Sequence, residues 1–124
     1  MDTSIKILIV DDFATMRRIL KNTLKQLGFN NFVEADDGTT AWKILESEQF
    51  DLIIADWNMP KLTGFELLKK VRVSDLHRTT PFLMVTAEAQ KDQVVKAVNA
   101  GVSNYVVKPF TEEILANKLE KILN

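Results

Sequence analysis

Residues 52–60 read Leu52-Ile53-Ile54-Ala55-Asp56-Trp57-Asn58-Met59-Pro60, an apolar run that ends at a carboxylate and is followed by a turn. The run is short, rich in β-branched residues and apolar at successive positions, which favours a strand covered on both faces over an amphipathic helix. In open α/β sheets, ligands bind beyond the carboxyl ends of the strands. Asp56 lies at such an end and is therefore the first candidate for a functional residue.

Three other apolar runs end in polar residues in the same way. Parallel strands place their carboxyl ends at one edge of a sheet, so these polar groups would gather beside Asp56. The runs and the residues that follow them are Ile7-Leu8-Ile9-Val10 with Asp11-Asp12, Phe82-Leu83-Met84-Val85 with Thr86, and Tyr105-Val106-Val107 with Lys108-Pro109.

Helical spacing of apolar residues separates the predicted strands. It predicts helices over 13–27, 39–47, 65–73 and 89–100, with a last helix capped by Thr111, and a further short strand covers 32–35. Five strands that alternate with five helices predict an α/β fold, a doubly wound parallel sheet, because each parallel crossover needs a helix. With 124 residues and neither linker nor repeat, we expect one domain, 1–124, without an output domain.

Each predicted helix has an apolar stripe that we expect to face the sheet. His77 lies in a polar segment beside Arg78, and we expect it at the surface. In chain order, the predicted inward residues are Phe13, Met16, Ile19, Leu20, Leu24 and Leu27; Ala41, Ile44 and Leu45; Leu67, Leu68 and Val71; Val94, Val95 and Val98; and Ile114, Leu115, Leu119, Ile122 and Leu123.

Composition excludes several classes of function. The chain has no cysteine, which removes disulfide frameworks and thiolate zinc sites and fits a reducing compartment. Sixteen basic and seventeen acidic side chains give a formal net charge of -1, which does not favour binding to nucleic acid or to anionic lipid. No apolar run approaches the roughly 20 residues of a membrane span, and no signal-peptide pattern precedes the first strand. We expect a cytoplasmic protein.

The expected cluster of acidic residues has a specific chemistry. Adjacent strands lie about 5 Å apart, so Asp11, Asp12 and Asp56 would repel one another unless one is protonated or a divalent cation bridges them. Oxygen ligands without histidine or cysteine favour a hard ion, Mg²⁺ more than Ca²⁺, and the Asn58 main-chain carbonyl could add a ligand. A phosphoryl group fits a site with a cation, the Thr86 hydroxyl and a lysine, and Asp56 would be its acceptor.

Each candidate also has an ordinary structural interpretation. Asp11 or Asp12 could cap the first helix, Thr86 could cap a later helix, Asp56 could be a turn residue, and Lys108 a solvated loop residue. Caps and turns alone do not explain why three acids, a hydroxyl and a lysine would share one sheet edge. The conjunction therefore favours the functional interpretation.

These residues resemble the response-regulator receiver domain family over the whole chain. The resemblance rests on Asp11-Asp12, Asp56, Thr86-Ala87 and Lys108-Pro109-Phe110, each placed after its strand. It implies a flavodoxin-like sheet of strand order 2-1-3-4-5. The stretches 12–18, 56–60, 86–89 and 105–110 resemble, more narrowly, the chemotaxis members of that family. Two departures are mild: Ala14 stands where a serine is frequent, and Val98 where an alanine is usual.

The resemblance implies a phosphorylation switch rather than a metabolic enzyme. A chemotaxis histidine kinase would phosphorylate Asp56, with Mg²⁺ held by Asp11, Asp12, Asp56 and the Asn58 carbonyl. Thr86 and Lys108 would contact the phosphoryl oxygens, Thr86 and Tyr105 would form the switch, and Asn58 and Glu88 would modulate hydrolysis. The implied output surface, which would bind the flagellar motor switch protein, includes Lys91, Val94, Val98, Tyr105, Val107 and Lys118.

Other functions remain open on the sequence. A freestanding phosphorelay shuttle that passes phosphate to a histidine phosphotransfer protein would carry the same site. A phosphatase acting through an aspartyl phosphate is less favoured, because Asp11-Asp12 is a plain pair without the DxD spacing of that class. The turn after the first strand has no glycine, which argues against dinucleotide binding. We expect a monomer, and the sequence leaves open whether a dedicated phosphatase acts on it.

Overall fold

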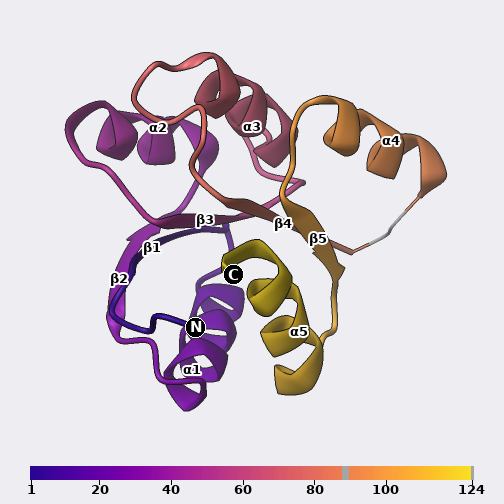
Figure 1. Ribbon diagram of the computed structural model, residues 1–124. Coiled ribbons are helices and arrows are strands. Elements are labelled where there is room, and N and C mark those ends of the chain that lie inside the picture. The colour runs from indigo at the N-terminus through magenta and orange to yellow at the C-terminus, as the bar shows by residue number, and fades with distance from the viewer. Residues whose placement is uncertain (88–89, 124) are drawn as a thin grey trace.

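Five parallel strands form one sheet in the order β2-β1-β3-β4-β5 in the computed structural model, which describes residues 1–87 and 90–123. One layer of helices, α2, α3 and α4, covers one face of the sheet, and α1 and α5 cover the other (Figure 1). The predicted fold class and strand order are both confirmed. Among the described residues, no helix is both long enough and apolar enough to cross a bilayer.

Strands and helices alternate along the whole chain, as the sequence predicts. The predicted start of the fourth helix, Ala89, lies outside the described residues. The elements are β1 (Lys6–Val10), α1 (Ala14–Gln26), β2 (Asn31–Ala35), α2 (Gly38–Ser47), β3 (Leu52–Asp56), α3 (Gly64–Val73), β4 (Phe82–Thr86), α4 (Lys91–Asn99), β5 (Asn104–Val107) and α5 (Glu112–Leu123).

The central strands are buried on both faces. All five residues of β3 and all five of β4 are buried. Alternate side chains point to opposite faces of a sheet. Ile53 and Ala55 accordingly pack in one core cluster with α2 and α3, whereas Leu52 and Ile54 pack in a second cluster with α1 and α5. This two-sided burial explains why the strands read as continuous apolar runs rather than as alternating ones.

The register of the strands brings their carboxyl ends to one edge. Val10 pairs with Ala55, Asp56 pairs with Val85, and Thr86 pairs with Val107. The residues that follow β1 and β5 therefore lie at the same edge as the last residues of β3 and β4. The sheet itself assembles the polar groups that the sequence distributes over four separate segments.

The predicted inward faces of three helices are partly wrong. Phe13 (64% exposed), Ile19 (44%), Val95 (49%), Val98 (60%) and Ile114 (44%) face outward. In α4 only Ala97 is buried. The reason is that α4 lies over the β4–β5 edge of the sheet (Figure 1), where little sheet remains for a wide apolar stripe to cover. Apolar spacing located this helix correctly but overestimated the buried width of its stripe.

The prediction that His77 lies at the surface is also wrong. The side chain is 2% exposed, its Nε2 lies 2.6 Å from the Leu45 carbonyl oxygen in α2, and its ring meets Trp42 edge-on at 6.4 Å. His77 thus links α2 to the segment between α3 and β4. Its neighbours in sequence are polar, but its partners lie more than thirty residues earlier in the chain.

The start of α3 is fixed directly beside Asp56. Thr63 and Glu66 form a capping box, in which each side chain accepts from the other residue's main-chain N–H. The Gly64 N–H donates to the Trp57 carbonyl at 2.9 Å. A Cβ atom at Gly64 would collide with the Asp56 carbonyl oxygen, so this position requires glycine for close approach rather than for backbone freedom.

Candidate functional site

Three carboxylates cluster at the carboxyl edge of the sheet. Asp11 and Asp12 follow β1, Asp56 ends β3, and one oxygen from each lies within 4.8 Å of the others. Asp11 is fully buried and Asp56 is 5% exposed. Asp11 Oδ1 accepts the Phe13 N–H at 2.9 Å, which closes the turn before α1. The first helix has no side-chain cap, so neither Asp11 nor Asp12 has the capping role that the sequence left open.

Lys108 supplies the positive charge that faces these acids. Its Nζ lies 3.4 Å from Asp56 Oδ1 and 3.6 Å from Asp11 Oδ2. The lysine follows β5, two strands away from β3, and its N–H donates to the Thr86 carbonyl at 2.8 Å. The long side chain therefore crosses the end of β4 to reach the carboxylates, and the interpretation of Lys108 as a solvated loop residue is excluded.

The surroundings of the acids oppose their ionisation. Burial raises the pKa of the Asp11 carboxyl and of the Asp56 carboxyl, and the Lys108 ammonium only partly offsets this by favouring the charged forms. Neighbouring carboxylates raise both pKa values further. One ammonium against three acids leaves an excess of negative charge in a small volume.

Two carboxylate oxygens in this cluster remain without hydrogen-bond donors among the described residues. Asp11 Oδ2 and Asp12 Oδ1 are both buried atoms that accept no hydrogen bond, and the Lys108 ammonium lies 3.6 Å from Asp11 Oδ2, at the distance of an ion pair. Buried polar atoms normally have partners. Orphaned oxygens in an all-oxygen set fit a hard ion such as Mg²⁺ better than a softer metal. The donor set therefore fits the metal that the sequence predicts.

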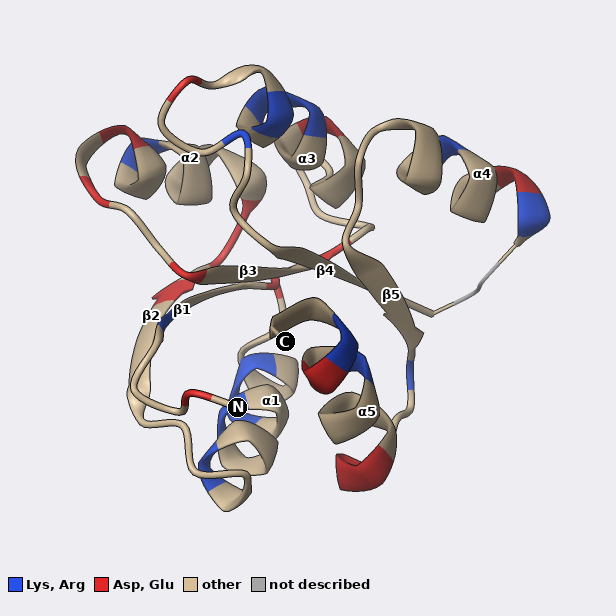
Figure 2. Ribbon diagram, viewed as in Figure 1, with Lys and Arg blue, Asp and Glu red and all other residues tan. Residues whose placement is uncertain are grey.

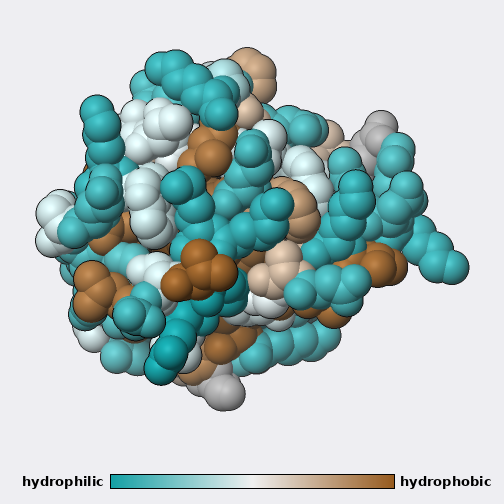
Figure 3. Space-filling model, turned by 90° about the horizontal axis from the view of Figure 1, so that it is seen from above, coloured by the Kyte–Doolittle hydropathy of each residue, from teal (hydrophilic) through white to brown (hydrophobic). Residues whose placement is uncertain are grey.

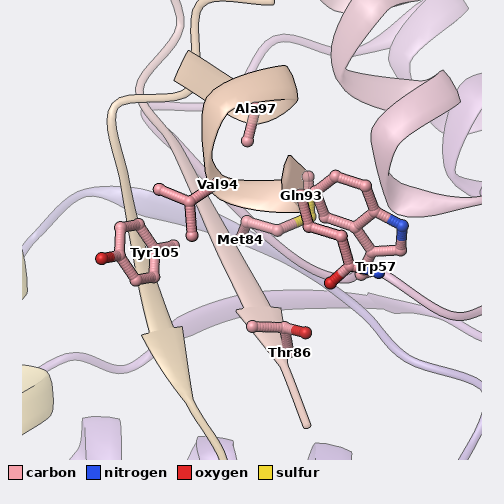
Figure 4. A pocket seen from close by; sticks show the side chains of 7 residues that line it. All are labelled: Trp57, Met84, Thr86, Gln93, Val94, Ala97 and Tyr105. Carbon is pink, nitrogen blue, oxygen red and sulfur yellow. The ribbon is translucent and has the colours of Figure 1, made fainter. Parts of the chain in front are cut away.

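Thr86 connects the acidic site to a small cavity under α4. Trp57, Met84, Thr86, Val94 and Tyr105 are among the residues that line this apolar cavity of about 10 Å³, roughly the room of one water molecule (Figure 4). The Tyr105 hydroxyl points away from the other lining side chains in Figure 4, and Lys118 Nζ lies 5.0 Å from the ring centroid.

Arg17 is a contributor that the sequence analysis missed. Its Nη1 donates to the Asp11 carbonyl at 2.6 Å, and its Nε donates to Glu34 at 3.1 Å, where Lys21 also binds. The contact ties α1 to the turn that carries two of the three acids. Since its acceptor is a main-chain oxygen, no side-chain pattern in the sequence signals it.

Two predicted residues are not brought into the cluster by any described contact. Asn58 is exposed two positions beyond Asp56, and its carbonyl ligand role stays a prediction. Glu88 lies outside the described residues, so its predicted effect on hydrolysis also stays a prediction.

The predicted output residues lie on α4, β5 and α5. Lys91, Val98 and Val107 are exposed, whereas Val94, Tyr105 and Lys118 are half-buried. Helical spacing places the exposed Val95 beside Lys91 and Val98, and Ile114 beside Lys118. Val95 and Ile114 were assigned to the interior by the sequence analysis and instead enlarge the apolar part of this surface.

Known proteins share both the sequence and the fold of this chain. Residues 7–120 match the family described as response regulator receiver domain. The chemotaxis protein CheY of Pseudomonas aeruginosa is 59% identical over 117 residues, which cover 94% of each chain. The solved structure of CheY4 of Vibrio cholerae superposes with a TM-score of 0.88 at 36% identity, covering 97% of this chain and 99% of that one.

A third relative bears on the metal. The receiver domain of a sensor histidine kinase from Pseudomonas aeruginosa has a TM-score of 0.84 at 25% identity and covers 98% of this chain and 99% of its own. That protein was solved with a magnesium ion coordinated in its active-site cleft.

Proposed function

The chain belongs to the response regulator receiver domain family, and on that premise we propose that it is a cytoplasmic chemotaxis response regulator switched by phosphorylation of Asp56. One observation carries the proposal: Asp56 is a buried carboxylate with Lys108 Nζ 3.4 Å away and two further acids within 4.8 Å. That arrangement surrounds one nucleophilic oxygen with the groups that phosphoryl transfer requires.

The proposed reaction transfers a phosphoryl group from a kinase phosphohistidine to Asp56. An Asp56 carboxylate oxygen forms the new P–O bond while the P–N bond breaks, and the departing imidazole nitrogen takes up a proton. Asp11, Asp12, Asp56 and the Asn58 carbonyl would hold Mg²⁺, which supplies positive charge to the transferring group. Lys108 would exchange its contacts with the carboxylates for a phosphoryl oxygen, and the Thr86 hydroxyl would donate to another.

The proposed signal runs from Thr86 to the output surface. Thr86 and Tyr105 line the same small cavity, so a shift of Thr86 toward the phosphoryl group would free space for the Tyr105 ring. A change from 1:99 to 99:1 between two states needs about 5.5 kcal/mol, whereas one charge-assisted hydrogen bond gives about 1.5–3 kcal/mol. Partner binding must therefore supply part of the free energy.

The proposed partners are a chemotaxis histidine kinase and the flagellar motor switch protein, with a phosphatase as a further candidate regulator of the phosphorylated form. The exposed apolar side chains Val95, Val98, Val107 and Ile114 support a protein-binding surface on α4, β5 and α5. The charged residues Lys91 and Lys118 flank it.

The first test is phosphorylation by acetyl phosphate with Mg²⁺, followed by intact-protein mass spectrometry and site mapping. We expect one acid-stable, base-labile phosphoryl group on Asp56, absent in Asp56→Asn and absent when Mg²⁺ is chelated. Asp36→Asn is the matched control, because Asp36 is an exposed acid that follows β2 at the same edge of the sheet. A phosphoryl group that persists in Asp56→Asn would disprove the assignment.

The second test concerns the partner. A peptide from the motor switch protein and a histidine phosphotransfer protein are each used to pull down the chain with and without beryllofluoride. Capture of the motor peptide only with beryllofluoride supports the proposal. Phosphate transfer to the histidine protein, without any capture of the motor peptide, would instead identify a phosphorelay shuttle.

A further inference from the structure

A second hollow lies between α3 and α4, and none of its lining residues belongs to the acidic site. It is an open surface groove of about 460 Å³, a volume within the size range of ligand-binding clefts. It lies on the face covered by α2, α3 and α4, where apolar side chains are set among polar ones (Figure 3). The lining residues are Phe65, Lys69, Arg72, Val73, Lys96 and Asn99, with Ala100 at one side.

All the charged residues that line this groove are positive. Lys69, Arg72 and Lys96 line it and no acidic residue does, although the chain as a whole has a formal net charge of -1. Figure 2 shows the positive residues of α3 on this helical layer. Neither Lys69 nor Lys96 forms an ion pair with any residue in 1–87 or 90–123. Lys69 interacts electrostatically with Glu66, one turn earlier in α3, without forming an ion pair, so both ammonium groups can contact an anionic partner.

The positive charges differ in how far they can move. Arg72 donates to the carbonyl oxygens of Gly101 and Thr80, each at 2.7 Å. It therefore adds positive charge to the wall of the groove, but its guanidinium is not free to form a bidentate contact with a ligand. Lys69 Nζ lies 4.8 Å from the centroid of the Phe65 ring, a cation–π distance. Lys96 approaches the groove from α4. The two lysines thus stand on opposite sides of the groove.

The floor and rim of the groove are apolar. Val73 is 83% exposed, more than any other large hydrophobic residue described, and it lies on the groove beside Phe65 and Ala100. Leu76, three residues further along the chain, is 63% exposed. An exposed apolar strip between cations does not complement a nucleic-acid backbone or a lipid headgroup, because both of these bind to a broad positive surface. It matches a protein segment with apolar and acidic side chains in alternation.

We propose that the α3–α4 groove is a docking site for an acidic, amphipathic segment of a protein partner. The segment places apolar side chains on Phe65 and Val73 and carboxylates on Lys69 and Lys96, in the manner of a peptide bound in a groove. This site is separate from the output surface on α4, β5 and α5, because Lys96 and Asn99 face α3. Phosphorylation of Asp56 is not required for it.

The groove is in physical contact with the region around Asp56. Phe65, which lines the groove, stacks on Trp57 with ring centroids 5.2 Å apart and ring planes 12° from parallel. Trp57 follows Asp56 directly and lines the cavity that contains Thr86 and Tyr105. Occupation of the groove therefore reaches the indole of Trp57, whose fluorescence gives a readout independent of phosphorylation.

The test selects binders from a random-peptide display library on the unphosphorylated protein. Binding of the enriched peptides is then measured through Trp57 emission in a Trp42→Phe background, which leaves one indole. We expect enrichment of peptides that alternate acidic and apolar residues. Lys69→Glu combined with Lys96→Glu should weaken these peptides by about tenfold or more, as expected for loss of opposed charges.

Matched variants make the result specific. Lys25→Glu combined with Lys43→Glu gives the same charge change on exposed parts of α1 and α2 and should leave binding unchanged. Peptides with lysine in place of glutamate should recover binding to the doubly reversed variant. Val73→Asp should also abolish binding of the original peptides. The 83% exposure of Val73 leaves the core unchanged in this variant, and circular dichroism checks that it folds.

Three outcomes would overturn the proposal. They are a library that yields no acidic binders, binders whose affinity is the same in the groove variants and the wild-type protein, and binding of a single-stranded oligonucleotide or anionic vesicles at the same lysines. Because phosphorylation is absent throughout, failure here leaves the assignment of Asp56 untouched, and failure of that assignment leaves this test intact.

Discussion

At the scale of single residues, Asp37 and Asp56 show opposite effects of their surroundings on a carboxyl group. Asp37 Oδ1 accepts from Thr39 Oγ1 at 2.6 Å and from the Thr40 N–H at 2.9 Å, which lowers the Asp37 pKa to about 2. Asp56 is buried beside other acids, and its pKa is raised. Asp37 is the N-cap of α2 and stabilises the fold, whereas the charged form of the buried Asp56 carboxyl is disfavoured by the fold.

We predict that Asp37→Ala lowers the free energy of unfolding by about 0.5–2 kcal/mol at pH 7, the usual value of an N-cap. Because the folded pKa of Asp37 lies below that of the unfolded chain, its charge-dependent contribution is complete above about pH 4. It is lost as the pH falls from there toward 2. Urea unfolding between pH 7 and pH 3 measures both effects.

Two variants show whether the cap or the charge is responsible. Asp37→Asn keeps a good N-cap and should retain most of the stability at pH 7 while losing the acid-dependent part. Asp36→Ala, at the exposed neighbouring position, should change little. Equal destabilisation by Asp36→Ala and Asp37→Ala would contradict the capping explanation.

At the scale of elements, Arg72 joins α3 to two loops at the amino-terminal edge of the sheet. Its guanidinium donates to the carbonyls of Gly101, Arg78 and Thr80 at 2.7–3.2 Å. Burial lowers its pKa, though the group stays charged. One side chain thus satisfies main-chain acceptors before β4 and before β5.

We predict that Arg72→Met lowers the free energy of unfolding by about 2–3 kcal/mol, since it leaves several carbonyl groups without their donor. Arg72→Lys should retain only a small part of the stability that Arg72→Met loses, because one ammonium group cannot donate to acceptors in three directions. The urea midpoint, with an unchanged m-value, measures the effect. Lys43→Met on the exposed face of α2 is the control, and a similar loss there would refute the explanation.

Element positions were predictable from the sequence for a physical reason. Strands buried on both faces must be apolar at every position, so β1, β3 and β4 are visible as runs, and their polar ends indicated the site. Contacts to main-chain oxygens carry no such signal. Arg17 on the Asp11 carbonyl and His77 on the Leu45 carbonyl were therefore missed or misplaced.

Helix faces were less predictable than helix positions. The apolar stripe of α4 includes Val95 and Val98, which the sequence analysis assigned to the core. A stripe that docks on the sheet and a stripe that docks on a partner have the same spacing. Only the place of α4 at the sheet edge distinguishes them, and that place depends on the whole strand order.

At the scale of the whole molecule, the acidic site lowers the stability of the fold. Burial raises the pKa of Asp11 and Asp56, so the folded state binds their protons more tightly than the unfolded chain does. Stability is therefore lost as the pH rises from about 4 through these raised values, and the loss is complete only above them.

We predict that Asp56→Asn raises the free energy of unfolding in a chelator at pH 7 by roughly 0.5–2 kcal/mol, as is common for stabilising substitutions. The difference should shrink as the pH falls toward about 4. Mg²⁺ should stabilise the wild-type protein by mass action and the variant much less. Thermal and urea unfolding of the wild-type protein and of Asp56→Asn, each with Mg²⁺ and with a chelator, measure these differences in stability.

Asp36→Asn is again the control at an exposed position, and there we expect no increase in the free energy of unfolding. If Asp56→Asn is less stable than the wild-type protein in chelator at pH 7, the Asp56 carboxylate contributes to the stability of the fold and burial does not disfavour its charged form.

The shared lysine has a kinetic consequence. Lys108 divides one positive charge between Asp11 and Asp56 and cannot balance three acids. A phosphorylated donor is itself an anion, so the excess negative charge of the three carboxylates repels it unless a divalent ion is bound. For the proposed phosphoryl transfer we therefore expect the divalent ion to bind before the donor, and the rate of phosphorylation should saturate with the concentration of that ion.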